Sequence, residues 1–258
     1  MAIDQFEIDE KYSLSIYHFN LQYVAGDVST YHHLHKSSMR PFLRFFDENP
    51  QWCASCEIQG HYLKFMQKFY PEDLSLLRKL NQREQIEMVT VHYSDQIYLA
   101  YPKRDLQESI DITDQIYDEL GIKRSGVWFG QENFFGQGIA EEIMEPNNYH
   151  TALVNHHLVW HHDHEKGGKI KAPYWKFNGF EHDRINYLIS NGQLYQDPKK
   201  GIRVQQKFSY WDDAELAFGA TPYLPWLAKP EKQYREHVIK YKKLEREGWK
   251  MVKVKDYI

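Results

Sequence analysis

Strand-like and helix-like segments alternate along this chain, and this alternation constrains the fold more than any other feature. Amphipathic helical patterns recur between short segments rich in β-branched and aromatic residues. Repeated strand–helix units of this kind predict a parallel sheet with helices outside it. The strand-like segments are 12–19, 52–58, 85–93, 125–131, 151–160, 203–211 and 249–258, and the helix-like ones are 37–50, 58–69, 71–84, 104–122, 138–146 and 231–248.

One long segment breaks the alternation. Residues 161–203 are rich in Gly, Lys and Asp and are predicted to be irregular. A connection of that length is usually functional, so we expect a loop or lid here. No repeat or linker divides the 258 residues, which are therefore expected to form a single domain, 1–258, that carries this insertion.

Charge and hydropathy limit the partners. The net charge of −4 argues against nucleic acid, because phosphate binding needs a basic surface. The longest apolar runs are too short to span a bilayer, so no membrane association is expected. The N-terminal residues lack the basic and apolar regions of a signal peptide, which predicts a cytoplasmic protein. No pattern indicates an oligomeric state.

The two cysteines, Cys53 and Cys56, form one CxxC motif. A single CxxC lacks the four ligands of a structural zinc site, and a thioredoxin-like motif would open a helix. Here the pair lies in a strand-like segment, where residues three apart face opposite ways. Structural cysteines are therefore favoured over a redox pair.

Aromatic residues make up 16% of the chain and histidines number 14. Most of the rings are expected in the core, but rings also pack against sugars, so the composition permits a carbohydrate site. Two tracts, 31–36 and 156–164, hold several histidines each. These could bind a metal, hydrogen-bond sugar hydroxyls, or be ordinary core and surface residues.

In parallel barrels the functional site lies at the carboxyl ends of the strands. Glu132 follows one predicted strand and Asp213 another. Two such carboxylates could flank a glycosidic bond, ~5–5.5 Å apart in a retaining glycosidase and ~6.5–9.5 Å apart in an inverting one. A strand-end acid can instead cap the following helix. The strand-end rule selects residues 18–22, 92–95, 131–132, 156–157 and 212–215.

Three of these strand ends resemble motifs of glycoside hydrolase family 57, whose barrel is shared with family 38 mannosidases and polysaccharide deacetylases. LSIYHFNLQY, from residue 14, resembles the first motif. SGVWFGQENFF, from residue 125, resembles the strand that bears the catalytic nucleophile. SYWDDAELAFG, from residue 209, resembles the motif of the acid/base, which places Asp213 in that role. The resemblance covers nearly the whole chain, in order.

The resemblance implies a distorted (β/α)7 barrel, with parallel strands and outer helices. It also implies a retaining glycoside hydrolase or transglycosidase that acts on an α-linked glucan or oligosaccharide, with Glu132 as nucleophile and Asp213 as acid/base. On this interpretation no metal or cofactor takes part. The residues expected to bind the sugar are His18, Asn20, His92, Asp95, Trp128, Gln131, Arg184 and Trp211.

The chain departs from the family pattern at several positions. Asn20 stands where the family has a second histidine, and Asp95 stands about where it has another. Gln131 occupies the position of the nucleophile, and Glu132 follows one residue later. A glutamine amide cannot form the glycosyl ester.

Three interpretations therefore stay open. A one-residue bulge beside Gly130 could bring Glu132 into the site. Alternatively, the protein is a degenerate, non-catalytic barrel that binds carbohydrate. A third possibility is a metal-dependent hydrolase that uses His18, Asp95 and histidines of 156–164.

Overall fold

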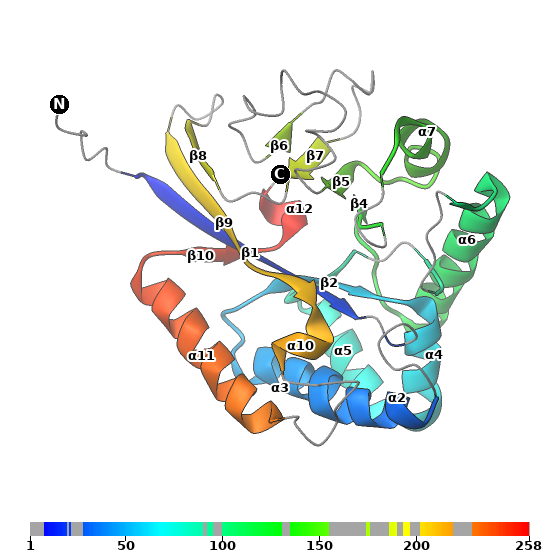
Figure 1. The fold of residues 1–258 in the computed structure, drawn as a ribbon, viewed down its shortest axis with the longest axis horizontal. Helices are drawn as coiled ribbons and strands as arrows, with labels where there is room; N and C mark the ends of the chain where they lie inside the picture. Colours follow the sequence, from blue (N-terminus) through cyan, green and yellow to red (C-terminus); the bar gives the residue numbers. More distant parts are fainter. Residues whose placement is uncertain are drawn as a thin grey trace.

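The structure is a computed structural model. It describes residues 8–19, 21, 28–89, 92–94, 100–130, 135–154, 174–175, 186–189, 193–196, 202–218 and 229–257. These residues form an α/β fold of mostly parallel strands with helices packed outside them (Figure 1). The predicted fold class is thereby confirmed.

The first sheet is built around β1 (Glu10–Phe19). On one side β1 pairs in parallel with β9 (Arg203–Asp213) along almost its whole length. On the other side it pairs in parallel with β10 (Lys250–Val252) along its first half and with β2 (Ala54–Ile58) along its second half. β3 (Ile86–Met88) lies beyond β2, and β8 (Gln193–Gln196) pairs antiparallel with β9.

The second sheet continues the first. β4 (Val127–Trp128), β5 (Thr151–Val154) and β7 (Asn186–Ile189) pair in parallel, and β6 (Tyr174–Trp175) pairs antiparallel with β7. A parallel bridge between Met88 and Arg124 links the two sheets. Parallel neighbours therefore run from β9 through β1, β2 and β3 to β4, β5 and β7.

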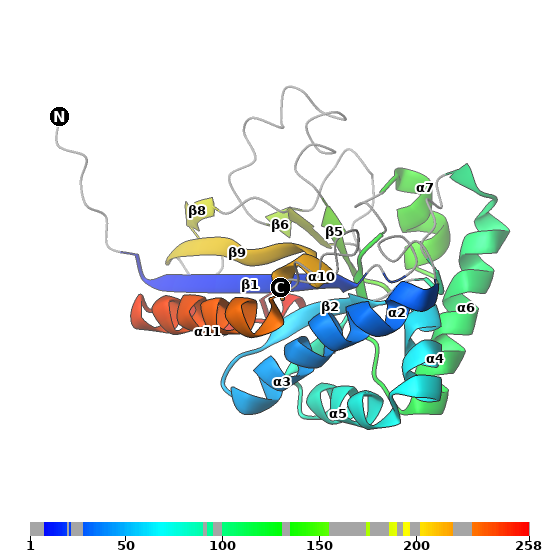
Figure 2. The ribbon, with the colours of Figure 1, turned by 60° about the horizontal axis from the view of Figure 1, so that its bottom comes forward.

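Helices cover the outside of the sheet, and Figure 2 shows α2, α3, α4, α5 and α11 on one side of β1 and β2. Pro71 and Pro230 each occupy the first position of a helix, where a missing N–H costs nothing. The helices are α2 (Val28–Leu34), α3 (Arg40–Glu48), α4 (Gly60–Phe69), α5 (Pro71–Gln82), α6 (Lys103–Leu120), α7 (Gln137–Ile139), α10 (Ala214–Ala217), α11 (Pro230–Arg246) and α12 (Val254–Tyr257), with the π-helical turns η1 (His35–Met39) and η4 (Ala140–Met144).

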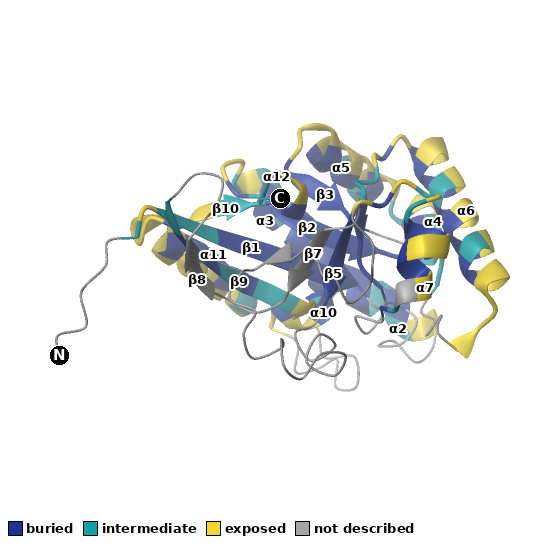
Figure 3. Cartoon of the chain, turned by 90° about the horizontal axis from the view of Figure 1, so that it is seen from above, coloured by how far each residue is buried: buried dark blue, intermediate teal, exposed yellow. Residues whose placement is uncertain are grey.

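Alternation along the strands separates an inner core from outer clusters of buried residues. An outer core, which includes Tyr17 and Phe19 of β1, packs against the helices. An inner core contains apolar residues from strands of both sheets, so the strands curve around one shared interior. Figure 3 shows buried residues concentrated on β1, β2 and β3 and exposed residues on the outer turns of α5 and α6. The inner core consists of Leu14, Ile16, Val89, Val127, Phe129, Leu153 and Val254, with Phe208 and Trp211 packed against it.

Two strand predictions differ from the structure. The segment 161–203, predicted to be irregular, contains β6, β7 and β8, which were missed because each has four residues or fewer. Of these, β7 pairs in parallel with β5. The segment 249–258, predicted as one strand, pairs with β1 only over Lys250–Val252. It then turns into α12, so that Val254 enters the inner core.

Candidate active site

His18, Glu57 and Asp213 lie side by side on three neighbouring strands. In the pairing of β1 with β2, His18 is the register partner of Glu57, and in the pairing with β9 it is the partner of Asp213. Register partners in parallel strands face the same side of the sheet, and adjacent strands are ~4.8 Å apart. The three residues therefore form one row across the inner face, at the carboxyl ends of their strands.

A bulge in β9 determines which acid joins this row. Leu14 pairs with Phe208, but the next residue, Ser15, pairs with Tyr210, so Ser209 is an extra residue. Before the bulge the even-numbered Phe208 faces the inner core, and after it the odd-numbered Trp211 does. Bulges near active sites re-aim side chains in this way. Here the bulge places Asp213, rather than its neighbour Asp212, on the face of His18.

Asp213 also occupies the N-cap position of α10, yet its side chain makes no capping hydrogen bond to that helix. The capping interpretation that the sequence left open is therefore not supported. The backbone around Asp213 is held instead by Tyr210, whose hydroxyl donates to the Asp213 carbonyl oxygen, and by Ser38, whose hydroxyl donates to the Ala214 carbonyl oxygen at 2.9 Å.

His18 contacts a buried carboxylate. Its Nδ1 lies 2.5 Å from Oε2 of Glu57, and the two residues are 7% and 0% exposed. The ring of Phe129, which directly follows β4, lies 5.4 Å from the His18 ring, between centroids. Phe129 in turn lies 5.9 Å from the ring of Trp211. Side chains of β1, β4 and β9 thus meet at the same end of the interior.

His92 follows β3 and is fully buried. Its carbonyl oxygen accepts a hydrogen bond from the backbone of Gly60, which fixes it beside the start of α4. Burial lowers the pKa of His92 to about 4, the Glu57 charge acts in the opposite direction, and the His18 charge lowers it further. His92 is therefore neutral near pH 7 and does not balance the charge of Glu57.

Of the other predicted sugar-binding residues, the structure describes only Trp128 and Trp211. Trp128 is 2% exposed and packs in a separate cluster with Tyr149 and residues of α6 and η4, so the structure does not bring it to the inner face. Trp211 packs against the inner core, near Phe129. Asn20, Asp95, Gln131, Glu132, Arg184 and the tract 156–164 lie outside the described residues.

Sequence reasoning missed Glu57, although its position carried a signal. Ala54, Cys56 and Ile58 are the apolar, outward-facing residues of β2, so period-two alternation turns Ser55 and Glu57 inward. Glu87, the inward residue of β3, is also buried, at 3% exposure. Burial raises the pKa of Glu87, and its Oε2 accepts from the Ser55 hydroxyl at 2.5 Å, one layer below His18 and Glu57.

Two motifs remain, the histidine tract 31–36 and the cysteine pair. In the tract 31–36, Nδ1 of His32 lies 2.8 Å from the Tyr70 hydroxyl, and Nε2 of His35 lies 2.8 Å from Asp73. The cysteines are both unpaired thiols, and burial raises the pKa of each. Among the residues that the structure describes, no three His, Cys, Asp or Glu side chains are placed to hold a metal ion.

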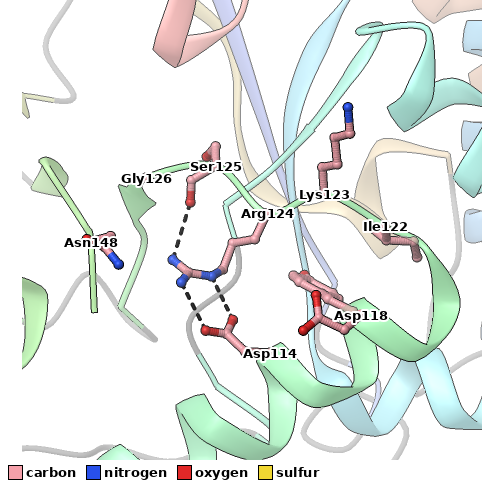
Figure 4. A pocket seen from close by; sticks show the side chains of 9 residues that line it. Asp114, Asp118, Ile122, Lys123, Arg124, Ser125, Gly126 and Asn148 are labelled. Atoms are coloured by element: carbon pink, nitrogen blue, oxygen red, sulfur yellow. Dashed lines mark hydrogen bonds and ion pairs between the residues drawn. The ribbon is translucent and has the colours of Figure 1, made fainter. Parts of the chain in front are cut away.

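A cleft of about 450 Å³ opens at the amino end of β4 (Figure 4), and His18 is not among the residues that line it. Arg124 on its wall donates to both carboxylate oxygens of Asp114, at 2.7 and 2.9 Å, and its guanidinium lies 4.2 Å from the centre of the Tyr149 ring. Residues at the amino end of barrel strands usually serve stability. We accordingly infer that Arg124 stabilises the packing of α6 against the turn before β5.

Within the described part of the chain, no helix is long and apolar enough to cross a membrane.

Comparison with known sequences gives a consistent result. The sequence profile of glycosyl hydrolase family 57 matches residues 7–258. A 4-alpha-glucanotransferase from Thermococcus litoralis is 25% identical over 70% of this chain and 27% of its own length. An alpha-amylase from Pyrococcus horikoshii is 24% identical over 73% of this chain and 31% of its own length. The chain thus spans less than a third of the length of these curated relatives.

Solved structures share the fold. The 4-alpha-glucanotransferase from Thermococcus litoralis superposes with a TM-score of 0.70 at 16% identity, over 98% of this chain and 40% of that one. A GH57-type branching enzyme from Pyrococcus horikoshii gives a TM-score of 0.63 at 12% identity, over 95% and 70%. An alpha-mannosidase from Enterococcus faecalis gives 0.57 at 13% identity, over 96% and 28%.

Proposed function

The chain belongs to glycosyl hydrolase family 57, and from this premise we propose that it is a retaining glycoside hydrolase or transglycosidase that acts on α-linked glucans or oligosaccharides. The names of its relatives, 4-alpha-glucanotransferase and alpha-amylase, support the choice of substrate. The observation that carries the proposal is the register of His18 and Asp213. It sets an acid beside a histidine on the inner face, at the carboxyl ends of β1 and β9.

In the first step, the Glu132 carboxylate attacks the anomeric carbon while Asp213 donates its proton to the departing glycosidic oxygen. The products are a glycosyl ester and the released sugar. In the second step, Asp213 removes a proton from water or from a hydroxyl of an acceptor sugar. The oxygen of that group attacks the anomeric carbon and frees Glu132. Two inversions leave the α configuration unchanged.

The proposed sugar contacts form two groups. His18 and Trp211 line the inner face directly, and the sequence prediction adds Asn20, Asp95 and Arg184, which lie outside the described residues. His92 and Trp128 are buried. We assign to these two residues an indirect effect on the site, through the side chains that they pack against.

A second candidate function is carbohydrate binding without turnover. It is favoured by the alternation along β4 and the residue after it: the odd-numbered Val127 and Phe129 face the inner core, and Trp128 faces the outer cluster. Residue 131 is also odd-numbered, and it is a glutamine. It lies outside the described residues. If Gln131 takes the inner position, the protein retains the acid/base but lacks the nucleophile.

Activity assays on a panel of α-linked glucans separate the two functions. The proposal expects the wild-type protein to be active and Glu132→Gln to be inactive. Full activity in Glu132→Gln would show that the nucleophile is wrongly assigned. Activity that appears only in Gln131→Glu would establish the natural protein as a sugar-binding barrel.

A further inference from the structure

We propose that Glu57 is a positioning residue that fixes the orientation and tautomer of His18 for sugar binding. This inference rests on the proposed function, because it assigns to His18 a place in the substrate site. Glu57 has no assigned role in the sequence motifs. It is the register partner of His18 on the adjacent strand β2, and it is completely buried.

The contact between the two side chains is close. The distance from Nδ1 of His18 to Oε2 of Glu57 is 2.5 Å. The second carboxylate oxygen of Glu57, Oε1, has no hydrogen-bond partner among the described residues. A buried carboxylate is costly unless it is paired. His18 is the group that pairs with Glu57, so the two must be considered as a unit.

The chemistry of the pair fixes the tautomer. An ionised carboxylate only accepts hydrogen bonds, so the proton of a neutral His18 resides on Nδ1. The other nitrogen, Nε2, is then an acceptor for a sugar hydroxyl and becomes a donor when the ring is protonated. Without Glu57 the imidazole could take either tautomer and could rotate about its side-chain bonds. Glu57 therefore selects one hydrogen-bonding state out of several.

Acidic residues face His18 from both neighbouring strands. Glu57 on β2 faces His18 from one side, and Asp213 on β9 faces it from the other. His92, beyond Glu57, is neutral near pH 7, because burial lowers its pKa to about 4. The Glu57 carboxylate stabilises protonated His18. Replacing Glu57 with glutamine removes this charge and leaves the side chain almost unchanged in shape.

The test is histidine NMR on the whole protein, with 15N-labelled imidazoles and the His18 signal assigned from a His18→Gln sample. In Glu57→Gln we expect the pKa of His18 to fall by ~1–3 units. We also expect its Nδ1–H tautomer to give way to a mixture. The matched control is Asp73→Asn, which neutralises the partner of His35 in the outer layer and must leave the His18 signals unchanged. Should Glu57→Gln fail to fold, Glu57→Asp keeps the charge but shortens the side chain, and the tautomer mixture is again expected.

Binding of maltoheptaose, measured by calorimetry, gives the functional readout. We expect Glu57→Gln to bind about tenfold more weakly than the wild type, and Asp73→Asn to bind as the wild type does. The positioning role is wrong if His18 titrates identically in wild type and Glu57→Gln. If the wild type neither binds nor cleaves α-glucans, the proposed function fails, and the NMR titration still decides whether Glu57 orients His18.

Discussion

The ammonium group of Lys240, on α11, donates a hydrogen bond to the carbonyl oxygen of Ser209, the extra residue in the β9 bulge. The Ser209 hydroxyl in turn contacts the Ser13 hydroxyl on β1. A helix on the outer face and a neighbouring strand thus hold the irregularity that turns Asp213 inward. The position of the proposed acid/base depends on a contact four residues before it in the sequence.

A one-residue shift in register tests whether this position matters. Deletion of Ser209 removes the bulge but keeps the register, because Tyr210 still pairs with Ser15 and Asp213 with His18. Insertion of one alanine between Trp211 and Asp212 instead gives Asp212 the register of His18 and turns Asp213 away. We expect the insertion variant to lose at least about 100-fold in turnover of α-glucans, the lower end of what acid–base catalysis contributes. The deletion variant is the control and should retain most of its turnover, and an insertion variant as active as that control would show that the register does not orient Asp213.

Asp213 and Asp212 offer a matched pair for substitution. They are adjacent in the sequence, but only Asp213 is the register partner of His18. Asp212 is the register partner of the outward-facing Tyr17, and it is exposed. Asp213→Asn removes the transferable proton, so turnover should fall by roughly 10²–10⁴-fold. Asp212→Asn should change turnover little. Equal losses in the two variants, measured with the same α-glucan, would contradict the assignment.

The sequence predicted those parts of the fold that local patterns determine. The strand predicted at 12–19 was found as β1, where Tyr17 and Phe19 alternate with Ile16 and His18. The helix predicted at 71–84 was found at Pro71–Gln82 because Pro71 and the acidic residues after it mark a helix start. The α/β class follows from many such segments, each of which is determined by its own residues.

The site depended more on pairing between distant strands, which a local pattern does not reveal. The bulge at Ser209 exists only relative to β1, and the link from Glu57 to His18 joins residues 39 positions apart. Glu57 lies in a segment that reads simply as a strand with cysteines. Its importance emerges only when β1 is placed beside β2. The strand β7 was likewise missed, since its four residues become a strand through pairing with β5.

Gly121 ends α6 in the left-handed region, with a φ of +64°. Its backbone N–H donates to carbonyl oxygens of the last helical turn, and its neighbour Ile122 is buried. Gly121→Ala should destabilise the protein by about 1 kcal/mol, because a side chain disfavours this conformation. Urea unfolding measures the change. An unchanged midpoint and slope would indicate that the turn relaxes at no cost.

His237 should make the protein sensitive to acid. It is 7% exposed, and its Nε2 lies 2.8 Å from the Tyr17 hydroxyl. Burial, and then the charge of Lys240, lower its pKa from 6.5 to about 3. Between these two values the unfolded state binds a proton that the folded state does not. The stability that the neutral imidazole supports is therefore present above pH 6.5 and is lost as the pH falls toward 3.

One such histidine lowers the free energy of unfolding by about 2 kcal/mol between pH 7 and pH 5, at ~1.4 kcal/mol for each unit of pKa difference. His237→Gln removes the titration and can keep a hydrogen bond to Tyr17. Urea unfolding at the two pH values should therefore show a loss about 2 kcal/mol smaller in the variant than in the wild type. His150→Gln, at an exposed surface position, serves as the comparison and should lose stability as the wild type does. Parallel losses in the wild type and His237→Gln would mean that His237 is protonated in the folded protein, so that its burial does not contribute to acid denaturation.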